Sequence, residues 1–231
     1  MSAARSAASS VTSRHRFRAS RSAGEVSALV TRPEHARWML VLAHGAGAGM
    51  EHSFMEALAA GLAAHGVASF RYQFPYTERG SKRPDPPALL EATVRSAVEA
   101  AAAHADLPLL AGGKSMGGRM TSQAAAKEPL AVVRGIAFFG FPLHAIGKPG
   151  AERAVHLNDV DVPMLFLQGS RDRLARLDLL EPVIRRLGSR ATLHVIEDAD
   201  HSFHVPARSG RTDEDVLDEL SRRTAEWAAG R

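Results

Sequence analysis

The chain has 231 residues, 45% of them hydrophobic, and a formal net charge of +4. That length and apolar content are enough for one domain with a complete core. Cysteine is absent, which excludes disulfides, thiol nucleophiles and thiolate metal sites. The absence is also compatible with a reducing cytoplasm, which is the location we predict. No apolar run approaches about 18 residues, so we expect no membrane-spanning helix.

The positive charge is concentrated at the start of the chain. Residues 1–24 contain no acidic residue and five arginines, namely Arg5, Arg14, Arg16, Arg18 and Arg21. Without these five the formal charge of +4 becomes −1. The segment is otherwise rich in Ser and Ala, so its composition predicts a disordered tail at 1–24 and a folded domain at 25–231.

The tail lacks the apolar core of a secretory signal, so we expect it to be either an organellar transit peptide or a dispensable extension. Because the basic residues lie in the tail, we expect no nucleic-acid partner for the domain. Association with nucleic acid through the tail is the alternative, and it predicts salt-sensitive binding to polyanions.

Strands and helices are predicted to alternate beyond the tail. The expected strands are 26–31, 37–43, 67–72, 107–111, 132–139, 164–167 and 192–196, and the expected helices are 53–65, 89–104, 118–127, 177–187 and 213–229. This order indicates an α/β fold with a mostly parallel central sheet and helices on both faces. Residues 140–163 are broken by Pro and Gly, so we expect no substantial lid and a shallow, open site.

A G-x-S-x-G pattern, Gly113-Lys114-Ser115-Met116-Gly117, follows the apolar segment 107–111. This pattern is typical of a nucleophile elbow, in which the chain turns from a strand into a helix so sharply that only glycine fits beside the serine. The pattern alone also fits an ordinary strand-to-helix turn. The apolar strand before it and the small residues after it favour the elbow, with Ser115 as the nucleophile.

Two later loops provide an acid and a base. Asp172 follows the apolar strand 164–167 and a glycine, and His201 follows the strand 192–196. The chain order Ser115, Asp172, His201 differs from the order in chymotrypsin-like and subtilisin-like proteases, and all three residues follow the carboxyl ends of predicted strands, where open parallel sheets build their sites.

Each of these assignments has a competitor in the sequence. Asp198 and Asp200 are closer to His201 along the chain than Asp172 is, and either is able to cap a turn or orient the imidazole. His204 is an alternative base. We favour Asp172 because a strand-Gly-x-x-Asp loop aims its carboxylate across the top of the sheet.

The predicted strand 37–43 runs into the glycine-rich segment His44-Gly45-Ala46-Gly47. Such a turn is expected to provide one oxyanion donor, the N–H of Ala46, while the N–H of Met116 provides the other. We expect His44 to stabilise this loop and His52 to lie exposed in a first helical turn. The segment does not fit G-x-G-x-x-G, and Pro108 stands where a Walker A loop needs glycine, which disfavours nucleotide binding.

No cofactor and no metal are expected, because the sequence has neither an H-E-x-x-H helix nor a cysteine pair. Arg71, Lys114 and Arg119 are placed near strand ends or the elbow, so a carboxylate-bearing substrate is conceivable. Packing or solvent exposure is the plainer interpretation of these three side chains.

Together these segments resemble the α/β-hydrolases, and most closely a compact lidless group similar to dienelactone hydrolases, to testis-expressed hydrolase-like proteins and to a subunit of a eukaryotic histone-acetyltransferase complex. The resemblance is carried by Leu42-Ala43-His44-Gly45-Ala46-Gly47, Arg71-Tyr72-Gln73-Phe74-Pro75-Tyr76, Gly113-Lys114-Ser115-Met116-Gly117-Gly118-Arg119, Phe141-Pro142-Leu143-His144, Leu167-Gln168-Gly169-Ser170-Arg171-Asp172 and Asp200-His201-Ser202-Phe203. It implies triad roles for Ser115, Asp172 and His201 and oxyanion roles for Ala46 and Met116. Relatives often have Pro after the acid, where this chain has Arg173.

The residues and the resemblance together predict a serine hydrolase that acts on an ester, thioester or lactone through an acyl-enzyme, with a small-molecule acyl substrate. A non-catalytic protein-interaction module on the same scaffold is the alternative. Fold and motif do not choose among ester-like bonds, and the sequence specifies no oligomeric state.

Overall fold

Eight strands form one sheet in the computed structural model of the chain, which describes residues 10–104 and 106–231. The spatial order is β1-β2-β4-β3-β5-β6-β7-β8. The strands are β1 (Ser10–Ser20), β2 (Gly24–Pro33), β3 (Trp38–Ala43), β4 (Val67–Tyr72), β5 (Leu109–Lys114), β6 (Val133–Phe139), β7 (Met164–Gly169) and β8 (Ala191–Ile196). Neighbours from β4 to β8 pair in parallel, whereas β2 pairs antiparallel with both β1 and β4.

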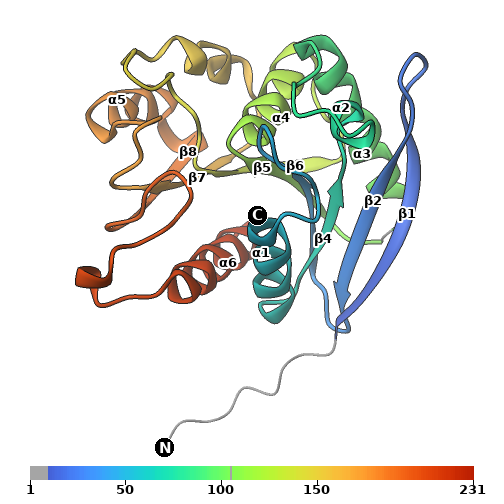
Figure 1. Cartoon of the computed structure of the whole chain (residues 1–231), viewed down its shortest axis with the longest axis horizontal. Helices are drawn as coiled ribbons and strands as arrows, with labels where there is room; N and C mark the ends of the chain where they lie inside the picture. The colour runs from blue at the N-terminus through green and yellow to red at the C-terminus, as the bar shows by residue number, and fades with distance from the viewer. Residues whose placement is uncertain (1–9, 105) are drawn as a thin grey trace, which may run out of the picture.

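Helices cover both faces of this sheet (Figure 1). They are α1 (Ser53–Ala64), α2 (Pro75–Glu78), α3 (Pro87–His104), α4 (Met116–Lys127), α5 (Leu177–Leu187) and α6 (Asp213–Ala229), with short 3-10 turns at Glu152–Asp159, Gly188–Arg190 and Ala207–Ser209. α1 and α6 pack on one face, and α3, α4 and α5 lie on the other. The predicted α/β architecture is therefore confirmed.

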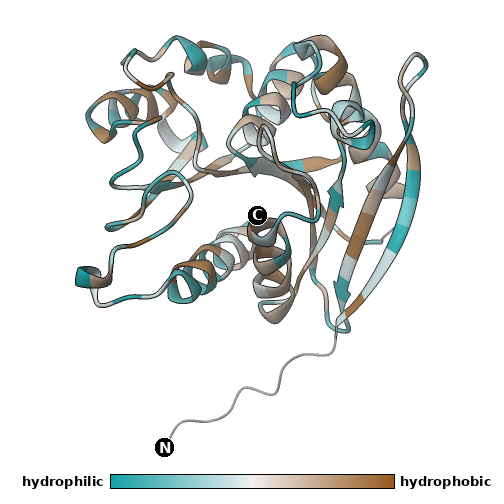
Figure 2. Cartoon of the chain, in the orientation of Figure 1, coloured by the Kyte–Doolittle hydropathy of each residue, from teal (hydrophilic) through white to brown (hydrophobic). Residues whose placement is uncertain are grey.

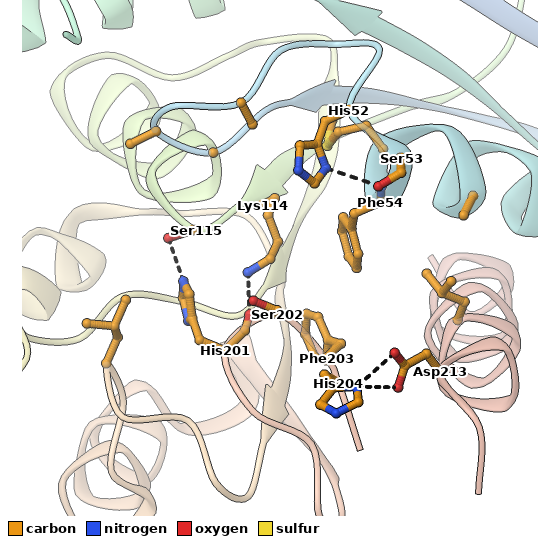
Figure 3. A pocket seen from close by; sticks show the side chains of 17 residues that line it. His52, Ser53, Phe54, Lys114, Ser115, His201, Ser202, Phe203, His204 and Asp213 are labelled. Atoms are coloured by element: carbon orange, nitrogen blue, oxygen red, sulfur yellow. Dashed lines mark hydrogen bonds and ion pairs between the residues drawn. The ribbon is translucent and has the colours of Figure 1, made fainter. Parts of the chain in front are cut away.

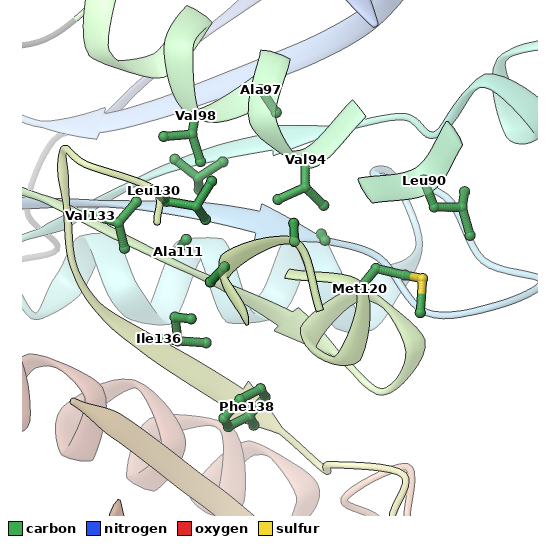
Figure 4. Packing of buried hydrophobic residues seen from close by; sticks show 14 of the residues in the cluster. Leu90, Val94, Ala97, Val98, Ala111, Met120, Leu130, Val133, Ile136 and Phe138 are labelled. Atoms are coloured by element: carbon green, nitrogen blue, oxygen red, sulfur yellow. The ribbon is translucent and has the colours of Figure 1, made fainter. Parts of the chain in front are cut away.

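The central strands are apolar along their length because helices bury them on both sides. Every residue of β3, β4 and β7 is buried. On the α3 side, Leu90, Val94 and Val98 recur every four residues along one face of the helix and belong to the same cluster as Ile136 and Phe138 of β6 (Figure 4).

The connection between β6 and β7 contains no regular α-helix within the described residues. It holds one 3-10 segment, Glu152–Asp159, as the Pro- and Gly-rich sequence led us to expect. None of the helices in the described part of the chain combines the length and hydropathy of a membrane span.

The prediction of disorder at 1–24 is wrong for residues 10–24, while residues 1–9 lie outside the described part of the chain. β1 (Ser10–Ser20) forms an edge strand, and Phe17 and Ala19 are buried against the sheet. Arg14 pairs with Glu51 at 2.5 Å, and Arg16 pairs with Glu25 and Glu78.

Composition misled the prediction because an edge strand with one exposed face needs few large apolar side chains. In Figure 2, the middle of β2 is hydrophobic, whereas β1 carries hydrophilic bands. The arginines that suggested a basic tail include two that are engaged by carboxylates of the folded domain. The sheet therefore begins upstream of the predicted domain boundary at residue 25.

Candidate active site

Ser115 lies in a tight turn between β5 and α4, with φ 51° and ψ −116°. Positive φ is strained for a serine, and the surrounding structure must hold it. The backbone N–H of Ser115 donates to the carbonyl of Phe139 at 3.1 Å. A Cβ at Gly113 or Gly117 would lie 2.4 or 2.5 Å from the carbonyl oxygen of Ala43, so both flanking positions of the motif require glycine.

The three widely separated residues Ser115, His201 and Asp172 form a continuous hydrogen-bonded chain. Nε2 of His201 lies 2.8 Å from Oγ of Ser115. Nδ1 of the same imidazole lies 2.7 Å from Oδ2 of Asp172. The Asp172 side chain is fully buried and that of His201 is 24% exposed, so the carboxylate is shielded from water while the imidazole is accessible from the pocket.

The Asp172 carboxylate is fixed by groups of its own loop and strand. The N–H of Leu174 donates to Oδ1 at 2.7 Å, and the side-chain amide of Gln168 donates to Oδ2. The buried His144 holds the same loop, because its N–H donates to the carbonyl of Leu174 at 2.9 Å and its Nε2 accepts from the N–H of Arg176. Sequence reasoning missed Gln168, although one amide near the end of an otherwise apolar strand was the available signal.

The competing acids lie elsewhere. Among the hydrogen bonds of the described residues, the His201 imidazole has Asp172 and Ser115 as its partners, and neither Asp198 nor Asp200 contacts it. Oδ1 of Asp200 instead accepts the N–H groups of Ser202 and His204, at 2.8 and 3.0 Å. Asp200 therefore caps the turn that presents His201.

The loop after β3 packs against the serine. A Cβ at Gly45 would lie 3.8 Å from Cβ of Ser115. The buried imidazole of His44 donates from Nδ1 to the carbonyl of Gly45 at 2.8 Å and accepts the N–H of Phe74 at Nε2. Burial lowers the pKa of His44 to about 4, so the ring is neutral at pH 7, which fits one nitrogen donating and the other accepting. The predicted loop-stabilising role of His44 is confirmed.

The N–H groups of Ala46 and Met116 have no acceptor among the hydrogen bonds of the described residues. Met116 is the first residue of α4, where backbone donors have no partner within the helix. Ala46 is exposed and lines the same pocket as Ser115. His52 is exposed, as expected, and lies at the N-cap just before the first turn of α1, where it accepts the N–H of Phe54.

Lys114 joins the elbow to the loop that carries His201. Its Nζ donates to the carbonyl oxygen of His201 at 2.6 Å and lies 5.8 and 5.3 Å from the ring centroids of Phe54 and Phe203 (Figure 3). Burial lowers the pKa of Lys114 to about 8, against the opposing attraction of Asp172 and Asp200. Lys114 is therefore packed at the turn, as the plainer interpretation predicted, and it also binds the loop that carries His201.

The two arginines considered for substrate binding do not line the pocket beside Ser115. Arg71 is buried and donates to the carbonyl of Met50 at 3.0 Å, which fixes the end of the loop after β3. Burial and the nearby Arg153 lower the pKa of Arg119. The packing interpretation is therefore confirmed for Arg71.

A pocket of about 660 Å³ opens beside Ser115 (Figure 3). Its walls come from the loop after β3, the first turns of α1, residues 201–204 and the start of α6. This volume lies within the usual range for small-molecule sites, about 300–1,000 Å³. His204 stands at the far end, bound to Asp213 at 2.9 Å, which raises the pKa of His204; it does not contact Ser115.

A family model described as an alpha/beta hydrolase domain matches residues 36–229. The chain belongs to the alpha/beta-hydrolase family. Within the described residues, no group of three or more His, Cys, Asp or Glu side chains is arranged to hold a metal ion.

Several solved structures share this fold. A dienelactone hydrolase from Anabaena variabilis superposes with a TM-score of 0.72 at 19% identity, covering 94% of this chain and 96% of its own. XC6422 from Xanthomonas campestris, described as a serine hydrolase without a lid, gives 0.73 at 19% identity and 94% coverage of both chains. An alpha-beta serine hydrolase homologue from Coxiella burnetii gives 0.72 at 19% identity, covering 91% and 96%.

Proposed function

We propose that the chain is a serine hydrolase of ester-like bonds, with Ser115 as nucleophile, His201 as general base and acid, and Asp172 as the group that orients the imidazole. The observation that carries the proposal is the unbroken chain of hydrogen bonds, 2.8 Å from Ser115 to His201 and 2.7 Å from His201 to Asp172. That arrangement is what activation of a serine hydroxyl requires.

In the first half-reaction, Oγ of Ser115 attacks the substrate carbonyl carbon while Nε2 of His201 takes the hydroxyl proton. Asp172 keeps the hydrogen bond from Nδ1–H and stabilises the imidazolium. The N–H groups of Ala46 and Met116 are proposed to hold the oxyanion, and such donors typically contribute about 3 to 4 kcal/mol each. Collapse of the tetrahedral intermediate breaks the bond to the leaving group, whose oxygen, or sulfur in a thioester, receives the proton from Nε2.

In the second half-reaction, water attacks the acyl-enzyme and gives a proton to Nε2 of His201. Collapse returns that proton to Oγ of Ser115 and releases the carboxylic acid. Each proton taken by the imidazole is thus returned within one turnover, so the cycle needs no metal and no cofactor.

A panel of ester, thioester and lactone substrates tests this proposal. We expect Ser115→Ala and His201→Ala to lower kcat by at least about 10³-fold with the fold intact. Ser209→Ala, a change in a surface 3-10 turn, is the matched control and should retain activity. Turnover by Ser115→Ala at the wild-type rate would refute the assignment. Absence of turnover on every substrate by folded wild-type protein would favour the interaction module.

The sequence also predicts a small-molecule substrate, no nucleic-acid partner for the domain and a cytoplasmic location, and these remain predictions. The pairing of Arg14 and Arg16 with carboxylates reduces the free positive charge on which the nucleic-acid alternative depended. A polyanion-binding assay at low and moderate salt tests that alternative directly.

A further inference from the structure

The pocket beside Ser115 extends along the side on which His201 lies. Residues 201–204, from the imidazole itself onward, form one wall, and the first turns of α1 together with Gly45, Ala46 and Ala48 of the loop after β3 form the facing wall. Figure 3 shows Ser115 and His201 at one end of the pocket and the pair His204–Asp213 at the other. The pocket therefore extends from Ser115 past His201, the proposed general acid.

This placement has a chemical consequence, because the two halves of an ester lie differently around the serine. The oxygen of the leaving group must come within hydrogen-bond reach of Nε2 of His201 to receive its proton. The alcohol half of the substrate therefore lies beside His201, where the pocket continues. The acyl half points away from the imidazole.

The walls of this space are mainly apolar. Phe54 of α1 and Phe203 stack with their centroids 5.8 Å apart and their planes 11° from parallel. Further apolar side chains on the lining are Met55, Ala57, Leu174 and Leu217. Among the described lining residues the one carboxylate is Asp213, which His204 binds, and the one ammonium group is that of Lys114, which donates to the carbonyl oxygen of His201. Such a lining gains most from an uncharged apolar group.

We propose that this pocket is the leaving-group site, and that the substrates are esters whose alcohol half is an apolar aryl or medium-length alkyl group. The inference rests on the proposed function. It adds that the protein selects its substrates by the alcohol half of the ester. Each methylene of the alcohol that becomes fully buried is expected to raise kcat/KM by about fourfold.

Hexyl acetate and ethyl hexanoate test this inference because they are isomers of equal apolar content that differ in which half carries the chain. We expect the wild-type protein to hydrolyse hexyl acetate with a kcat/KM at least about tenfold above that for ethyl hexanoate. Because kcat/KM reports the steps up to acylation, release of the acyl group does not affect the ratio.

Two variants narrow the pocket from opposite sides. Leu217→Trp fills the pocket from α6, and Ala57→Phe fills it from α1. If one variant fails to fold, the other still tests the inference. Each is expected to reduce the ratio of hexyl acetate to ethyl hexanoate to near one. Arg222→Trp places the same bulk five residues further along α6, outside the pocket, and should preserve the wild-type ratio.

A wild-type preference for ethyl hexanoate, or an equal loss on both isomers in both pocket variants, would overturn the leaving-group assignment. Ser115-dependent hydrolysis would stand in either case. If neither isomer nor any ester of the wider panel is hydrolysed by folded protein, the proposed function fails and this inference fails with it.

Discussion

Replacing Lys114 with Met tests whether burial destabilises the charged form of this side chain, because Lys114 is a desolvated ammonium beside the proposed catalytic residues. Burial lowers the pKa of Lys114 from 10.5 to about 8 in the folded protein. Between pH 8 and pH 10.5 the unfolded chain holds a proton that the folded protein has released, so this group makes folding stability rise with pH across that window. Below pH 8 both states are protonated, and the folded state bears the cost of the buried charge.

From pH 7.5 to pH 10 the expected gain from Lys114 is about 2 kcal/mol. Urea unfolding of the wild-type protein and of Lys114→Met at both pH values isolates this gain, because the other titrating groups are common to the two proteins. Lys114→Met should lack this gain. From pH 7.5 to pH 10, the difference in unfolding free energy between the two proteins should therefore shift by about 2 kcal/mol in favour of wild type. Lys82→Met, which removes an exposed loop lysine, controls for the loss of one positive charge. Parallel behaviour of wild type and Lys114→Met would refute the reasoning.

Three further changes test the elbow, the acid and the edge strand. Gly117→Ala places a Cβ 2.5 Å from a backbone carbonyl and should destabilise the fold by about 3 kcal/mol, seen as a lower Tm in calorimetry; an unchanged Tm contradicts the elbow geometry. Gln168→Glu replaces a donor to Asp172 with a second carboxylate and should lower kcat at least about tenfold with little change in KM, and wild-type kcat would argue against a positioning role. Phe17→Ala should cost about 3 kcal/mol in chemical unfolding, whereas no loss would indicate that β1 contributes little to the folded domain.

The sequence indicated most of the sheet because parallel strands buried on both faces are continuous apolar runs. The elbow was also visible, since Gly113 and Gly117 are required by close backbone approaches that no other residue permits. The three side chains proposed for catalysis each follow a strand end, so the topology was sufficient to bring them to one edge of the sheet.

Features that depend on tertiary partners were not predictable in the same way. β1 is polar along much of its length, and it forms because β2 and the acids at Glu25, Glu51 and Glu78 lie beside it. The contacts of Lys114 with Phe54 and Phe203 join residues far apart in the chain and carry no local pattern. Gln168 differs from these, because one amide in an apolar strand is a visible local signal.

The central claim is that Ser115 is a nucleophile activated by His201, and covalent labelling tests it most directly. A fluorophosphonate incubated with the folded protein, followed by intact mass measurement and peptide mapping, should give one adduct per chain on Ser115, and the adduct should be absent in Ser115→Ala and strongly slowed in His201→Ala. An adduct that persists in Ser115→Ala, or a wild-type protein that remains unlabelled while folded, would contradict the account.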